Sequence, residues 1–71
     1  MNVSGFISSI EGDQGGLNIQ ISGGGQFNLN LNSPNYRVMA DLLTLAFVNG
    51  RVVNLSLGHG TNSITGVGAH G

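Results

Sequence analysis

The chain has 71 residues, of which 39% are hydrophobic and 7% are charged, with no cysteine and a formal net charge of −1. A chain of this length forms one domain at most, over residues 1–71, and a single core of this size is marginally stable on its own. Disulfides and thiolate zinc sites are excluded, two histidines and three carboxylates are too few for a structural metal, and self-association remains. Two arginines, without any lysine, also argue against nucleic-acid binding, which depends on neutralising phosphates.

Three strands are predicted in the first half of the chain. Residues 2–10 are rich in β-formers, with Gly5 marking a bulge or a close approach, and residues 11–16 form a turn. Residues 17–22 and 26–32 then alternate strictly between apolar and polar side chains, and a glycine triplet joins them as a hairpin. The residues expected to point inward are Leu17, Ile19, Ile21, Phe27, Leu29 and Leu31.

The third strand has an unusual polar face. In the segment "FNLNLN", residues 27–32, every polar residue is asparagine. An uncharged alternating strand favours cross-β stacking if its edge is open. We therefore expect this strand to be paired on both sides, and its amides to contact a neighbouring subunit or a sugar. Asn28 and Asn30 are assigned to an oligomer interface on this ground.

The single helix is predicted over residues 33–50. Ser33 is the expected N-cap and Pro34 the first helical residue, and Gly50 supplies the left-handed stop. One apolar stripe is predicted to face the core: Tyr36, Met39, Ala40, Leu43 and Phe47. A second stripe is formed by Val38, Leu42 and Leu45. Either the helix sinks deep into its own core or the second stripe is an interface, and a chain this small favours the interface.

The last two strands are predicted over residues 51–58 and 64–67, joined by a loop. The element order is therefore βββ-α-ββ, with one helix in a mainly β chain. This order fits a five-stranded antiparallel barrel of the OB-fold type.

Candidate chemical groups are sparse. Glu11 and Asp13 lie in a glycine-rich turn, where they serve turn geometry and solubility or accept hydrogen bonds from sugar hydroxyls. His59 lies in a loop, either facing solvent or offering a donor to a ligand. No nucleophile-elbow motif and no metal-ligand spacing occurs, so neither an enzyme, a cofactor nor a metal is predicted.

The chain resembles the B subunits of pentameric AB-type bacterial toxins, with the Shiga-toxin and subtilase-cytotoxin B subunits nearest. The matching segments are "VSGFI", "LNIQISGGGQFNLNLN", "YRVMADLLTLAFVNGRVVNLSL" and "NSITGV". The resemblance implies a homopentameric ring around a central pore, recognition of cell-surface glycans and an accompanying A subunit. It also implies glycan contacts in the first inter-strand loop, at the strand-to-helix junction and on the last loop. The matching positions are Asp13, Asn32, Asn35, Tyr36, His59 and Asn62.

The chain departs from these toxins in lacking their usual disulfide and the aromatic residue of the last strand. No apolar run approaches the roughly 20 residues that span a bilayer, and no signal peptide is apparent, so membrane insertion is not expected. The resemblance implies a secreted or periplasmic location. Without the resemblance, the lack of a signal peptide and of cysteine favours the cytoplasm. Besides the sugar-binding ring, a structural or adaptor ring without a ligand, of phage or mobile-element origin, is a second hypothesis. An OB-fold nucleic-acid binder is the third.

Overall fold

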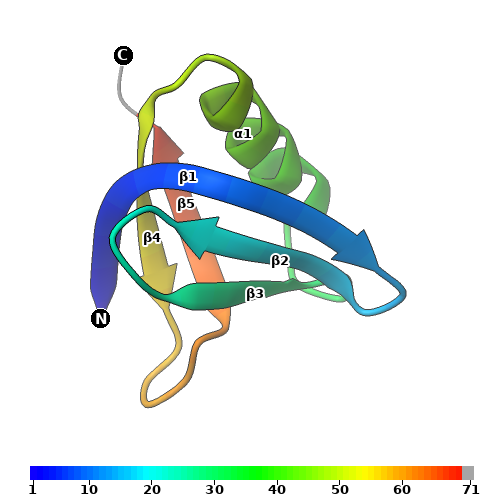
Figure 1. The fold of residues 1–71 in the computed structure, drawn as a ribbon. Coiled ribbons are helices and arrows are strands. Elements are labelled where there is room, and N and C mark those ends of the chain that lie inside the picture. Colours follow the sequence, from blue (N-terminus) through cyan, green and yellow to red (C-terminus); the bar gives the residue numbers. More distant parts are fainter. Residues whose placement is uncertain (70–71) are drawn as a thin grey trace.

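The structure, a computed structural model, describes residues 1–69 as five strands and one helix in the order βββαββ (Figure 1). The last two residues of the expected domain, 70 and 71, lie outside the described part. The fold is thus mainly β with one helix, as the sequence predicts. The elements are β1 (Asn2–Asp13), β2 (Gly16–Ile21), β3 (Gln26–Asn30), α1 (Tyr36–Val48), β4 (Val52–Leu57) and β5 (Ile64–Ala69).

All five strands form one antiparallel sheet in the order β3-β2-β1-β4-β5. The long strand β1 serves both halves of this sheet, and Figure 1 shows it arching across the molecule. Its first residues pair with β4, its last residues pair with β2, and the register shifts between Ile7 and Ser9. Gly5 marks a close approach, because a Cβ there would lie 2.7 Å from Cγ2 of Ile21.

The first turn is shorter than the sequence suggests. Residues 11–13 belong to β1, and Asp13 pairs with Gly16, so that only Gln14 and Gly15 form the turn. The carboxylates Glu11 and Asp13 consequently lie on the sheet and not in an open loop. The pairing with Gly16 fixes the position of Asp13 relative to the neighbouring strands.

The sheet is not closed into a barrel. The edge strand β3 meets Ser63, the residue before β5, at one parallel bridge through Asn28, and the backbone N–H of Asn28 donates to the carbonyl oxygen of Asn62 at 2.9 Å. β3 ends two residues later, at Asn30, and within residues 1–69 no ladder forms between β3 and β5. The expectation that β3 is paired on both sides therefore holds only at Asn28.

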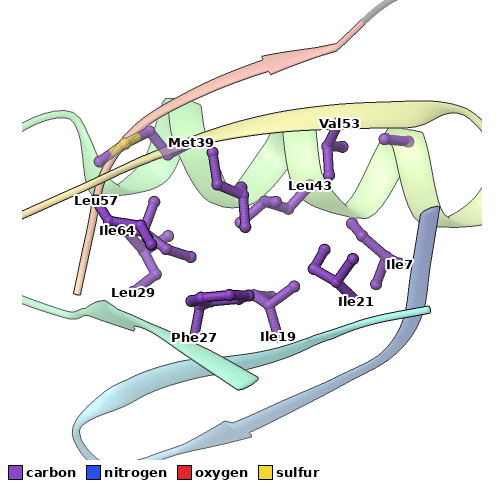
Figure 2. Close-up of a cluster of buried hydrophobic side chains, with 12 residues drawn as sticks. Ile7, Ile19, Ile21, Phe27, Leu29, Met39, Leu43, Val53, Leu57 and Ile64 are labelled. Carbon is purple, nitrogen blue, oxygen red and sulfur yellow. The ribbon is translucent and has the colours of Figure 1, made fainter. Parts of the chain in front are cut away.

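The core lies between the helix and the concave side of the sheet, and Figure 2 shows side chains from β2 and β3 pointing toward those of α1 and β4. The predicted alternation is confirmed for Ile19, Ile21, Phe27 and Leu29, all of which are buried. Leu31 was expected inward and is 51% exposed, since the chain leaves the strand after Asn30. The buried hydrophobic residues are Ile7, Ile19, Ile21, Phe27, Leu29, Met39, Leu43, Ala46, Val53, Leu55, Leu57 and Ile64.

The helix begins later than predicted. Ser33 is not its cap: the carbonyl oxygen of Ser33 accepts the N–H of Tyr36 in a turn that contains Pro34. The residue at the N-cap is Asn35, in the left-handed conformation with φ 60° and without a side-chain cap hydrogen bond. Asparagine tolerates this conformation better than most residues, which explains why the chain can turn here.

The predicted helix stop is confirmed. Gly50 has a φ of 64°. Its N–H donates to the carbonyl oxygen of Phe47 at 3.3 Å, and the N–H of Arg51 donates to the carbonyl oxygen of Ala46 at 2.9 Å. These two bonds form the Schellman motif, which satisfies carbonyl groups that the helix end would otherwise leave unpaired. We call this arrangement the helix C-cap.

The faces of the helix divide largely as predicted. Met39 and Leu43 are buried, together with Ala46, and Tyr36 and Ala40 pack against the same core. Phe47 was expected in this face and is instead 42% exposed. We call the residues of the second stripe, Val38, Leu42 and Leu45, the outer stripe. Val38 is 58% and Leu45 59% exposed, and Leu42 is half-buried, so residues 1–69 leave most of this stripe uncovered.

Candidate functional site

The outward side chains of β2 and β3 are almost all amides. The register places Gln20 opposite Gln26 and Asn18 opposite Asn28, and Asn30 lies opposite Gly16. Residues between them are buried, so these polar side chains share the outer face of the two strands. We call this surface the amide face. Its members are Asn18, Gln20, Gln26, Asn28 and Asn30.

A groove of about 300 Å³ lies at one end of the amide face. Three parts of the chain form it: the turn between β1 and β2, the paired strands β2 and β3, and the residue that precedes β5. We call it the amide groove. Its lining residues are Asp13, Gly15, Gly16, Leu17, Asn18, Asn28, Leu29, Asn30 and Ser63.

Hydrogen bonds hold the polar groups of the groove in place. The two carboxylate oxygens of Asp13 accept from the N–H of Gly15 at 2.8 Å and from Nδ2 of Asn18 at 3.2 Å. Oδ1 of Asn30 accepts the N–H of Asn32 at 2.8 Å, which directs its Nδ2 away from that bond. Within residues 1–69 the side chain of Asn28 has no hydrogen-bond partner, so both its donors and its acceptor are available.

Gly16 lines the groove and brings β2 close to β3. Its φ is 135°, and a Cβ at this position would lie 2.0 Å from the carbonyl oxygen of Leu29. Only glycine allows the two backbones to approach this closely. The pairing of Gly16 with Asn30 beside the groove therefore depends on glycine at this position.

The groove can bind by directed hydrogen bonds. Its polar lining side chains are three amides, one hydroxyl and the carboxylate of Asp13, the one charged group among them. Amides both donate and accept, so they suit a ligand with alternating donors and acceptors, such as a polyol. Within the described residues no three metal-ligating side chains come together.

Of the six residues predicted from the sequence to contact a glycan, three lie at or beside the groove. Asp13 lines it. Asn32 lies beside the groove, because its N–H donates to Oδ1 of the lining residue Asn30. Asn62 also lies beside it, because its carbonyl oxygen accepts the N–H of the lining residue Asn28. The first loop and the last loop therefore meet at one place.

The other three nominated residues lie elsewhere. Asn35 lines a separate hollow of about 320 Å³, with Met39 and Ile64 among its walls. Tyr36 is half-buried and packs against the core. His59 is exposed in the loop between β4 and β5 and lines neither the groove nor that hollow.

Sequence reasoning did not assign Asn18 or Ser63 to a site, and it assigned Asn28 and Asn30 to an interface. The register of β2 against β3 would have brought Asn18 beside Asn28, because both strands alternate cleanly and the glycine hairpin fixes their pairing. Ser63 could not have been found in this way, since it meets β3 only through the bridge at Asn28.

Comparison of the chain with protein families, with curated proteins and with solved structures finds no match. The resemblance to toxin B subunits therefore remains a prediction from element order and spacing. Within residues 1–69, no helix is both long and apolar enough to cross a membrane.

Proposed function

We propose that the chain is a carbohydrate-binding subunit of a homo-oligomer, with a pentamer favoured, and that it belongs to the OB-fold type of toxin B subunits. The observation that carries this proposal is the amide groove. It combines Asn18, Asn28 and Asn30 with one fixed carboxylate, Asp13, at the meeting point of three chain segments. Neutral amides beside a carboxylate are groups that accept from and donate to sugar hydroxyls.

The position of the groove supports the OB-fold assignment. OB-folds bind oligosaccharides and oligonucleotides on the face of their second and third strands, between the loops that follow strands one and four. The amide groove lies on β2 and β3, next to the turn after β1 and to Ser63 at the end of the loop after β4. An open sheet with one bridge between its edges is compatible with this fold, whose barrel is only partly closed.

The outer stripe supports association of copies. Val38 and Leu45 are more than half exposed on a helix whose other face is already buried. Apolar side chains that are aligned on one helix face gain free energy when a second apolar surface covers them. Several copies would present several grooves, and multivalency would convert weak binding at each groove into useful avidity.

A structural or adaptor ring without a ligand is the second candidate function. The outer stripe supports this ring equally well, whereas the amide groove has no role in it. Nucleic-acid binding is disfavoured by charge, because the one charged side chain in the groove, Asp13, repels phosphate.

A glycan array probed with labelled protein tests the proposal. We expect neutral glycans to bind, and Asn28→Ala to reduce their signal by about tenfold, because a lost hydrogen bond weakens each site and multivalency amplifies the loss. Gln26→Ala is the matched control: it removes an exposed amide from the same strand and face but does not line the groove. No binding to any glycan by an assembled oligomer would favour the ligand-free ring.

A further inference from the structure

Asn49 has a sequence context that no other asparagine of the chain shares. The chain contains nine asparagines, and only Asn49 is followed by glycine. Both Asn49 and Gly50 are exposed at the C-terminal end of α1. A glycine at this place leaves the following backbone nitrogen without steric protection, which is the condition under which asparagine side chains are attacked by their own backbone.

The reaction requires no enzyme and no oxidant. The backbone nitrogen of Gly50 loses its proton and attacks Cγ of Asn49, and ammonia leaves as a five-membered succinimide ring forms. Water then opens the ring at one of its two carbonyl carbons. Opening at the side-chain carbon regenerates the ordinary backbone, with aspartate at position 49, and opening at the main-chain carbon gives isoaspartate. The net change is the hydrolysis of one amide to one carboxylate and ammonia.

The helix C-cap opposes the first step of this reaction. Nδ2 of Asn49 donates to the carbonyl oxygen of Leu45 at 2.9 Å, and the N–H of Gly50 donates to that of Phe47 at 3.3 Å. For the ring to close, rotation about the Cα–C bond of Asn49 must bring the Gly50 nitrogen over Cβ of Asn49. The observed ψ of 2° instead places the Gly50 nitrogen over the backbone nitrogen of Asn49. The attacking atom and its target therefore come together only after the helix end opens.

We propose that Asn49 is a site of spontaneous deamidation whose rate is set by opening of the helix C-cap. The closed cap protects the residue, and each opening exposes it to ring closure. The rate of deamidation at Asn49 is consequently a measure of how often the last turn of α1 opens.

Asn49 also continues the outer stripe. Val38, Leu42, Leu45 and Asn49 are spaced i, i+4, i+7 and i+11, which places them along one face of the helix. Deamidation therefore adds a negative charge at the end of an exposed apolar stripe and next to the negative end of the helix dipole. This consequence rests on the proposed function: modified subunits should associate less readily, while an assembled oligomer covers the stripe and slows the modification.

Mass spectrometry of the full chain during incubation at mildly alkaline pH tests the proposal. We expect amide loss at Asn49 before any other asparagine, with aspartate and isoaspartate both formed. A free peptide covering residues 45–54, which has no cap, should react at least about tenfold faster than the folded chain. Urea at a concentration that unfolds the chain should remove this difference.

Gly50→Ala provides the decisive variant. Alanine shields the backbone nitrogen and slows the peptide, but it is strained at a φ of 64° and so opens the cap. The ratio of the peptide rate to the folded-chain rate should therefore fall several-fold in this variant, although both absolute rates decrease. Equal rates in the wild-type peptide and folded chain, an unchanged ratio in Gly50→Ala, or earlier deamidation at another asparagine would each overturn the proposal.

Discussion

The backbone N–H of Asn28 donates to the carbonyl oxygen of Asn62 at 2.9 Å and so connects the edge strand β3 to the loop between β4 and β5. The loop is held in shape by Thr61, whose hydroxyl donates to the carbonyl oxygen of Gly58 at 3.1 Å and accepts the N–H of Ser63 at 3.2 Å. A short loop that closes on itself thus covers the otherwise open, uncharged edge of β3 at Asn28.

Removing the hydroxyl in Thr61→Ala should loosen this connection. We expect the free energy of unfolding to fall by about 1 kcal/mol, because two exposed hydrogen bonds are lost, and hydrogen exchange at the Asn28 amide to accelerate. Thr61→Ser keeps the hydroxyl and should leave that exchange rate near the wild-type value. Equal exchange at Asn28 in the alanine variant and the wild type would show that the loop does not protect β3.

Gly16→Ala should be severely destabilising. The new methyl group would meet the Leu29 carbonyl oxygen at 2.0 Å in a backbone conformation that side chains rarely adopt, and we expect a loss of more than about 3 kcal/mol in thermal or urea unfolding. Gly24→Ala has a similar φ, 132°, with nothing within 4 Å, so it should cost only about 1–2 kcal/mol. A smaller loss at Gly16 than at Gly24 would contradict the close approach of β2 to β3.

The two faces of α1 should respond differently to truncation. Leu43 is fully buried, so Leu43→Ala should lower the free energy of unfolding by about 2–5 kcal/mol. Leu45 is 59% exposed, and Leu45→Ala should change the stability of a dissociated subunit by less than about 0.5 kcal/mol. The measurement is urea unfolding at a protein concentration low enough to dissociate any oligomer. Similar losses at both positions would be inconsistent with the observed burial.

The helix ends provide a further test. Ser33 does not cap α1, so Ser33→Ala should leave thermal stability within about 0.5 kcal/mol of the wild type. Gly50→Ala places a side chain at a φ of 64° and should cost about 1–2 kcal/mol. The opposite ranking would restore Ser33 as the N-cap.

The sequence was most informative where one physical pattern acted alone. Strict alternation placed Ile19 and Phe27 correctly, because a strand with one buried face shows its period directly. The stop at Gly50 was equally clear, since a left-handed residue after an apolar helix favours glycine.

Other features depend on contacts between distant residues. Leu31 continues the alternation of β3 and is nevertheless exposed, because its N–H donates to the carbonyl oxygen of Gly15 and the strand has already ended. Ser33 and Pro34 match a helix start, but the turn through Asn35 delays it. The groove itself requires the pairing of Asn18 with Asn28 and the approach of Ser63, neither of which is local in sequence.

The mass of the particle in solution tests the central claim most directly, because both the avidity of the amide groove and the covering of the outer stripe require several copies. Light scattering at micromolar concentration should give a multiple of the 7.3 kDa subunit mass, with a pentamer favoured. Leu45→Asp places a charge on the outer stripe and should reduce this mass to that of a folded monomer. The control Gln26→Asp places the same charge at an exposed position outside the stripe and should leave the mass unchanged. A wild-type chain that remains a stable folded monomer under these conditions would contradict the account.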